Sequence, residues 1–111
     1  MIILFDTTDL EELCNDDRSA KKKLGAPCAK KLPSRLDDLD AASNLEAMRT
    51  LPGKCHELKG DLAGCLAISL HGGFRLVFRP EHEPPPLKED GGLDWRAVTS
   101  IRVMSVEDYH D

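Results

Sequence analysis

The stretch that decides the fold runs LPGKCHELKGDLAGCLAISLHGGFRLVF, from residue 51 to residue 78. Upstream of it, apolar residues recur every three or four positions, which is typical of helices. Within it they form short runs or alternate, which indicates strands. Turn-forming residues divide the stretch: Pro-Gly near its start, Lys-Gly-Asp at 59–61 and His-Gly-Gly at 71–73. The sequence therefore predicts three consecutive strands, at 55–58, 62–70 and 74–78.

The first 50 residues have the pattern of helices after one short strand. Residues 2–5, IILF, are strand formers. A helix then starts with N-cap residues at 6–8 and breaks at 15–17, and a second helix over 18–24 ends at Gly25. A third helix is predicted from Pro27 to Ala42, and Pro33 is expected to kink or restart it. A short turn over 45–51 completes this half.

Two segments follow the deciding stretch. Residues 80–96, PEHEPPPLKEDGGLDWR, predict a long loop rich in proline, glycine and acids. Residues 97–106 predict a last strand, which the tail EDYHD follows at once. A strand, then helices, then three or four consecutive strands is the order of an α+β fold, in which a meander has helices packed on one face.

Length and composition limit the class of protein. The chain has 111 residues, so we interpret residues 1–111 as a single domain. Hydrophobic content of 41% and charged content of 32% are typical of soluble globular proteins. No apolar run approaches the ~20 residues that span a bilayer, and MIILFD lacks the pattern of a signal peptide. No membrane association is expected, and the expected compartment is the cytoplasm.

Charge and cysteine usage bear on ligands. The net charge of −5 argues against a general nucleic-acid binder, although a basic middle, residues 18–79, lies between acidic ends. The lysines and arginines of this segment are suited to bind phosphate groups, but charge runs are more often solvated helix faces. The four cysteines, at 14, 28, 55 and 65, are interpreted as reduced thiols packed in the protein. Disulfides or a zinc site with histidines are alternatives, but the spacings match no zinc pattern. No metal and no cofactor is expected.

Polar side chains in the strand half suggest RNA cleavage without a metal. In that reaction the 2′-hydroxyl group of the substrate is the nucleophile. It requires a general base, a general acid for the leaving 5′-oxygen, and cations for the charge on the phosphorane, and histidine suits both proton roles. Each residue also has a structural interpretation; Arg75, for example, would pair with Glu57 or Asp61. The candidates are His56, Lys59, Arg75, Arg79, Asp108, Tyr109 and His110.

Taken together, these motifs resemble the HigB-like branch of the RelE/ParE toxin superfamily. The matching pieces are LPG at 51–53, HELKGD at 56–61, Gly64, FRLVF at 74–78 and the terminal EDYHD. The resemblance implies a small twisted antiparallel sheet of four to five strands flanked by N-terminal helices. It also implies ribosome-dependent, metal-independent cleavage of mRNA. The implied partner is a cognate HigA-like antitoxin with a helix-turn-helix, in a possible heterotetramer.

The resemblance also implies roles for residues. His56 matches the family's histidine before the L-K-G turn, and Asp108, Tyr109 and His110 match its terminal D-Y-H, which implies catalytic roles for all four. Lys59, Arg75 and Arg79 would contact phosphate.

The chain also departs from the family. Leu62 stands where that family often has arginine, and residues 65–67 lack its usual aromatic. An acidic chain also has fewer cations for phosphate. The alternative is therefore a non-catalytic or attenuated protein of the same fold that acts by binding an antitoxin or gyrase. An unrelated α+β domain would leave the joint occurrence of these motifs unexplained.

Overall fold

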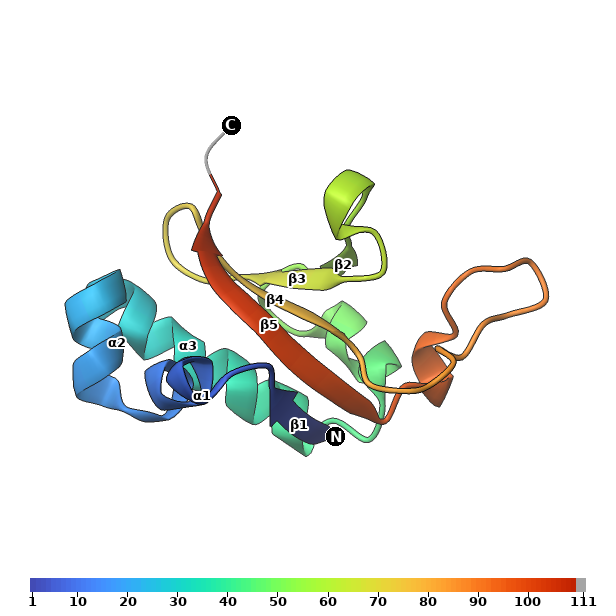
Figure 1. The fold of residues 1–111 in the computed structure, drawn as a ribbon, viewed down its shortest axis with the longest axis horizontal. Coiled ribbons are helices and arrows are strands. Elements are labelled where there is room, and N and C mark those ends of the chain that lie inside the picture. The colour runs from blue at the N-terminus through green and yellow to red at the C-terminus, as the bar shows by residue number, and fades with distance from the viewer. Residues whose placement is uncertain (110–111) are drawn as a thin grey trace.

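The structure is a computed structural model, and it describes residues 1–109. Three helices lie on one side of a five-stranded sheet (Figure 1). The helices are α1 (Thr8–Asn15), α2 (Asp17–Leu24) and α3 (Ala26–Ala41). The strands are β1 (Ile2–Phe5), β2 (His56–Glu57), β3 (Leu66–Ser69), β4 (Phe74–Pro80) and β5 (Ser100–Asp108). Three 3-10 turns complete the chain: η1 (Leu45–Thr50), η2 (Gly60–Leu62) and η3 (Trp95–Ala97).

Local capping sets the ends of the first helices. The Thr7 side chain accepts a hydrogen bond from the backbone N–H of Leu10 at 3.1 Å, at the start of α1. Asp16 then stands between α1 and α2, and its carboxylate accepts from the N–H of Arg18. Gly25 ends α2 with a φ of +85°, which glycine adopts without a steric penalty. The predicted break at 15–17 and the predicted stop at Gly25 are confirmed.

Of the two outcomes predicted at Pro33, a kink or a restart, the restart is wrong, because helix α3 is continuous from Ala26 to Ala41. Proline in a helix removes one backbone hydrogen bond and costs about 3 kcal/mol. Side chains on both sides of Pro33 are fully buried, among them Leu32 and Leu39. Burial of such side chains contributes about 1.5–3 kcal/mol each, which offsets the loss.

The sheet has the order β1-β5-β4-β3-β2. Strands β2 to β5 form the predicted meander, in which each strand pairs antiparallel with the next one. The first strand differs, because β1 pairs with β5 in parallel. Parallel neighbours require a long crossover connection, and the helices between β1 and the meander provide it. The α+β architecture is therefore as predicted, with a mixed sheet rather than a wholly antiparallel one.

Strand boundaries also differ from the prediction: β2 has only two residues, β4 continues to Pro80 and β5 begins at Ser100. The predicted strand at 62–70 is shortened to Leu66–Ser69, because η2 and a turn occupy the segment before it. Gly60 and Gly64 have φ values of +65° and +93° there, outside the range of regular strands. The last strand, in contrast, continues to Asp108, and its bonding extends to Tyr109, whose N–H donates to the carbonyl of Gly73 at 2.7 Å.

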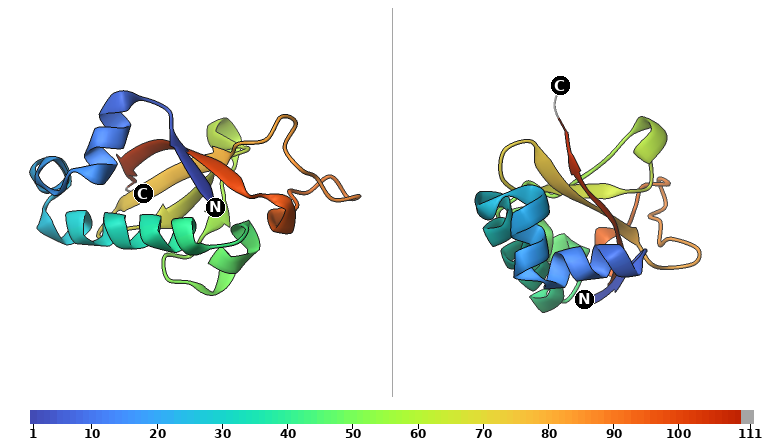
Figure 2. Two further views of the ribbon diagram at one scale, coloured as in Figure 1. Left: turned by 90° about the horizontal axis from the view of Figure 1, so that it is seen from below. Right: turned by 60° about the vertical axis from the view of Figure 1, so that its left-hand side comes forward.

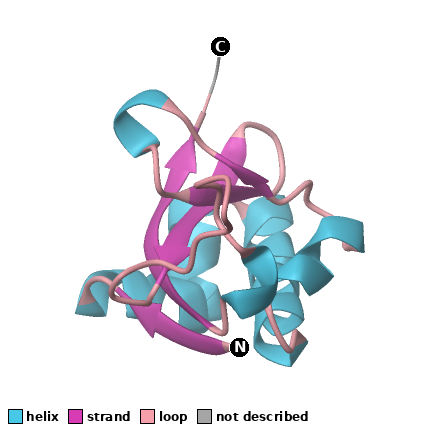
Figure 3. Ribbon diagram, turned by 90° about the vertical axis from the view of Figure 1, so that its right-hand side faces the viewer, coloured by secondary structure: helices cyan, strands magenta, loops and turns pink. Residues whose placement is uncertain are grey.

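The core lies between the helices and one face of the sheet (Figure 2). Leu76 and Phe78 of β4 and Ile101 and Val103 of β5 are fully buried on this covered face. Within residues 1–109, no α-helix lies on the opposite, open face, and the turn η2 stands on that side (Figures 1 and 3). We call these two surfaces the covered face and the open face of the sheet.

The loop between β4 and β5 extends away from α1–α3 at the far end of the molecule (Figure 1). A single antiparallel bridge between Leu87 and Leu93 closes its outer part. Its base is held by Glu81, whose carboxylate accepts two hydrogen bonds from Arg102 at 3.0 and 3.1 Å. No helix within residues 1–109 is long and apolar enough to cross a membrane.

Candidate functional site

The strand register places most of the predicted site residues on the open face. Directly paired residues share a face of a sheet, and alternate residues of one strand do too. One row of pairs runs from His56 through Ala67 and Val77 to Ser105. The neighbouring row joins Ser69, Arg75 and Glu107. His56 and Arg75 therefore stand on the same face, in adjacent rows.

Two adjoining hollows occupy this part of the open face. His56, Arg75 and Tyr109 line the first, with the small side chain of Ala67 also in its lining. Lys59, Arg75 and Tyr109 line the second, together with Asp61 of η2. Arg75 and Tyr109 are common to both hollows. The structure thus brings together four of the seven candidates from three strand segments and one turn.

Arg75 is held from two sides at the centre of this site. Its Nε donates to Oε1 of Glu107 at 2.8 Å, and Nη2 donates to the same oxygen. Its guanidinium carbon also lies 4.1 Å from the centroid of the Tyr109 ring, a cation–π contact. The side chain is only 14% exposed. A guanidinium group fixed in this way has a defined direction, and its other N–H groups remain as donors.

His56 has a defined hydrogen bond on one ring nitrogen. Its Nδ1 lies 2.8 Å from the backbone carbonyl oxygen of Lys54. A carbonyl oxygen only accepts, so we assign the proton to Nδ1. In the neutral ring, Nε2 then carries the lone pair and is free to accept a proton.

The backbone before His56 has an unusual conformation. Gly53 has a φ of +108°, and Lys54 is the one residue other than glycine in the described chain with a positive φ, at 52°. The carbonyl of Gly53 accepts a hydrogen bond from the N–H of Ser69 at 2.7 Å, which joins this segment to β3. The predicted Pro-Gly boundary is therefore also the bend that turns the Lys54 carbonyl toward the His56 ring.

Two further candidates, Asp108 and Arg79, lie elsewhere. Asp108 pairs with Phe74, so its side chain belongs to the covered face, where its charge raises the pKa of Cys28 after the larger effect of burial. Arg79 is on the open face but lines a separate hollow, and its Nε lies 3.8 Å from Glu81. His110 lies outside the described residues.

The sequence reasoning missed Glu107 as the partner of Arg75. The expected partners were Glu57 and Asp61, but the pair crosses from β4 to β5. A signal was present, since Glu107 precedes Tyr109 by two residues and so shares its face in an extended strand. Ser105, two residues earlier again, donates to Glu107 at 3.5 Å.

Metal and thiol chemistry find little support among the described residues. No group of three or more metal-binding side chains is present within residues 1–109. All four cysteines are unbonded to one another. Burial raises the pKa of the Cys55 thiol to about 12. The neighbour of His56 therefore stays protonated at neutral pH and is a poor nucleophile.

Comparisons with known proteins identify structures with a similar fold. No protein-family model matches the chain, and no curated protein does. Among solved structures, it is similar to a YoeB/ParE toxin from Agrobacterium tumefaciens, with a TM-score of 0.56 and 18% identity over 99% of this chain and 100% of that one. It is also similar to the YoeB-YefM complex from Staphylococcus aureus, with a TM-score of 0.54 and 19% identity over 100% of this chain and 98% of that one.

A third structure, the YoeB dimer from Staphylococcus aureus, matches with a TM-score of 0.54 and 21% identity over the same shares of the two chains. These likenesses cover 99% to 100% of this chain and 98% to 100% of the others. The chain therefore has the fold of these YoeB and YoeB/ParE toxin structures.

Proposed function

We propose that this chain is the toxin of a type II toxin–antitoxin pair and that it cleaves mRNA on the ribosome. The observation that carries the proposal is the clustering of His56, Lys59, Arg75 and Tyr109 around two adjoining hollows on the open face. These residues come from separate segments of the chain, and they supply the proton acceptor and the cations that RNA cleavage requires. The toxin fold of the solved relatives supports the same proposal.

His56 is the general base of the proposed reaction. Its Nδ1 proton is directed to the Lys54 carbonyl, which leaves Nε2 to accept the proton of the 2′-hydroxyl group. The activated 2′-oxygen then attacks the adjacent phosphorus, and the bond from phosphorus to the 5′-oxygen breaks. The sequence resemblance gives His110 a catalytic role, and we propose it as the general acid for that leaving oxygen; it lies outside the described residues.

Arg75 and Lys59 stabilise the charge that develops on the phosphate. Glu107 occupies Nε and one N–H of Nη2 on Arg75, and the other guanidinium N–H groups are available to phosphate oxygens. Tyr109 is 53% exposed, with one ring face against Arg75. Its hydroxyl group and its other ring face are placed to contact the RNA. Glu107 orients Arg75 in this proposal, and Asp108, for which the resemblance implied a catalytic role, has none.

The proposed partners are the ribosome with its mRNA and an antitoxin. One of the solved relatives is a heterotetrameric complex of a YoeB-YefM toxin–antitoxin pair. By analogy we propose that a neighbouring gene encodes the antitoxin of this chain, with a HigA-like helix-turn-helix as the sequence resemblance implies. The cytoplasm is the compartment in which both would act.

Expression in a bacterium tests the toxin proposal. Growth should stop when the chain is produced alone and should resume when the neighbouring reading frame is co-expressed. His56→Gln should restore growth, whereas His71→Gln, an exposed histidine on the β3–β4 hairpin, should not. Absence of growth arrest at protein levels confirmed by immunoblot would contradict the proposal.

A second candidate is a binding protein of the same fold. It is favoured by one observation, that both arginines of the open face on β4 are paired with acids, Arg75 with Glu107 and Arg79 with Glu81. Such pairing lowers the attraction for phosphate. Growth arrest that persists in His56→Gln, without mRNA cleavage, would favour this reading, with gyrase as the target to examine.

A further inference from the structure

Strand β2, which carries His56, is the least supported strand of the sheet. It has two residues and forms the edge of the sheet, with β3 as its single neighbour. Its pairs are His56 with Ala67 and Glu57 with Leu66. Because side chains alternate along a strand, His56 stands on the open face and Glu57 on the opposite side. An edge strand of this length requires additional contacts to keep a fixed position.

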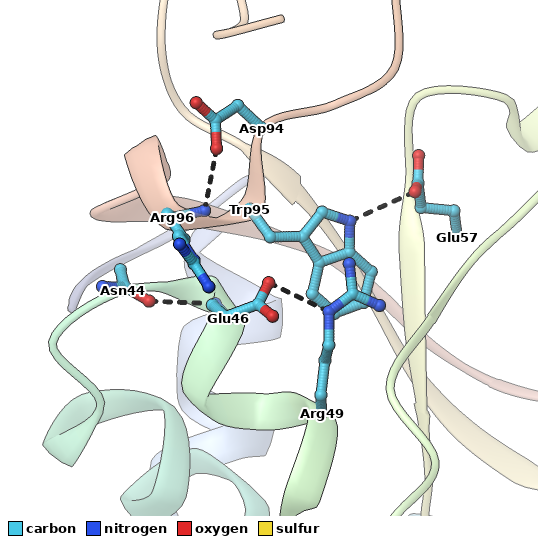
Figure 4. Close-up of polar contacts among 7 residues, drawn as sticks. All are labelled: Asn44, Glu46, Arg49, Glu57, Asp94, Trp95 and Arg96. Atoms are coloured by element: carbon cyan, nitrogen blue, oxygen red, sulfur yellow. Dashed lines mark hydrogen bonds and ion pairs between the residues drawn. The ribbon is translucent and has the colours of Figure 1, made fainter. Parts of the chain in front are cut away.

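Glu57 makes such a contact with Trp95. The indole Nε1–H donates to Oε2 of Glu57 at 3.1 Å (Figure 4). Trp95 begins η3, immediately after the long β4–β5 loop, and lies 38 positions away in the chain. A hydrogen bond to a charged acceptor is stronger than one between two neutral groups.

Trp95 itself is firmly held. It is 4% exposed, and the guanidinium carbon of Arg49 lies 3.8 Å from its ring centroid. Arg49 in turn is bonded to Glu46 of η1 at 2.9 Å. Figure 4 shows Arg49 over one side of the indole and Glu57 at its N–H edge. The Asp94 side chain accepts from the N–H of Arg96 and so caps the turn that presents the indole.

We propose that Trp95 is a positioning residue for His56. Its indole N–H holds the Glu57 side chain on the side of β2 opposite to the open face. This keeps the His56 ring on the open face beside Arg75 and Tyr109. The β4–β5 loop thus contributes to the site through its last residues, although it lies outside both hollows. The catalytic importance of this contact rests on the proposed function, but its effect on the His56 ring does not.

A structural role and a positioning role differ in what they change. If Trp95 only stabilises the fold, its removal lowers the free energy of unfolding and leaves the His56 ring in its native hydrogen bond. If Trp95 positions His56, loss of the indole N–H loosens β2 and weakens the bond from Nδ1 to the Lys54 carbonyl. The population of the two neutral ring tautomers then shifts.

The experiment uses nitrogen NMR of the His56 ring in the folded protein, with mRNA cleavage as a second readout. Trp95→Phe keeps an aromatic ring under Arg49 and removes the donor. Glu57→Ala removes the acceptor from the other side, and it serves as the test if Trp95→Phe does not fold. Arg96→Gln is the matched control, because Arg96 is an exposed side chain on the same turn.

Both Trp95→Phe and Glu57→Ala should reduce the Nδ1–H tautomer of His56 and slow cleavage about 10- to 100-fold, as small misplacements of catalytic groups do. Arg96→Gln should leave both unchanged. If the wild-type chain cleaves no RNA but the tautomer shifts, the function fails and the positioning role stands. An unchanged tautomer in the folded variants would overturn the positioning role, whatever the cleavage shows.

Discussion

At the scale of single residues, the alternation of side chains along the strands decides which of them meet at the site. His56, Lys59, Arg75 and Tyr109 were recognisable as candidates, and the structure brings them to two adjoining hollows. Asp108 was assigned from its place in the terminal motif. The sequence predicted that the last strand ends at residue 106 and that this motif follows it as a tail. Strand β5 instead continues through Asp108, and the alternation of side chains turns Asp108 to the covered face.

Arg75 provides a test of geometry at this scale. Lysine keeps the charge, but it cannot place two N–H groups on Glu107 and stack a planar group on Tyr109. Arg75→Lys should therefore reduce mRNA cleavage by at least about tenfold, because each good charged contact contributes 1.5–3 kcal/mol. Arg18→Lys, at an exposed position on α2, is the control and should cleave normally. Equal activity of the two variants would show that charge alone suffices.

Gly53 provides a test of the bend before His56. A Cβ atom at this position would overlap the Cγ2 methyl of Ile68 and lie 3.0 Å from Nε of Arg35. Gly53→Ala should lower the free energy of unfolding by about 2–4 kcal/mol, from strain and overpacking together. Gly60→Ala is the matched control, because its φ is also positive, at +65°, but no atom lies within 4 Å of the added Cβ.

Gly60→Ala should cost only about 1 kcal/mol. Denaturation with urea, followed by circular dichroism, measures both variants. If the two glycines prove equally replaceable, the close approach of Gly53 to Ile68 is not part of the native packing.

At the scale of elements, the sequence predicted the positions of helices and strands well and the pairing of the strands less well. The caps at Thr7, Asp16 and Gly25 are local, so they were visible in the sequence. The pairing of β1 with β5 joins residues from opposite ends of the chain, such as Ile2 and Ser100. No local pattern in the sequence encodes which strand β1 pairs with. The shortening of β3 was likewise hidden, because Leu62 is as apolar as the strand residues that follow it.

The base of the β4–β5 loop provides a pH test at this scale. Hydrogen bonds from Arg102 hold the pKa of Glu81 below its usual value of 4.5. Because the folded-state pKa is the lower one, the interaction stabilises the fold above the unfolded-state pKa and is lost as the pH falls through the folded-state pKa. The groups are near the surface, so the contribution is modest and salt screens it.

Glu81→Gln should therefore be less stable than the wild type at neutral pH, and the difference should shrink as the pH falls below 4.5. Thermal unfolding at several pH values measures it. Glu83→Gln, an exposed acid two residues further into the loop, is the control and should show no such convergence. A difference that stays constant with pH would mean that the Glu81–Arg102 contact does not stabilise the fold.

At the scale of the whole molecule, the toxin fold leaves one face of the sheet open while the helices cover the other (Figures 1 and 2). The α+β architecture was predictable because helical and strand periodicities occupy separate halves of the sequence. The finer assignment to the HigB-like branch rests on short motifs alone. Which pairs of charges neutralise one another across the open face depends on strand register, which the sequence does not encode locally.

The most direct test is cleavage of a defined mRNA on translating ribosomes by the purified chain. We expect wild-type protein to cut the mRNA only when it is being translated, and His56→Gln to reduce the rate by about 10²- to 10⁴-fold, the range for loss of a general base. His71→Gln should cut as the wild type does. Cleavage by His56→Gln at the wild-type rate, or no cleavage by the folded wild-type protein, would contradict the proposed mechanism.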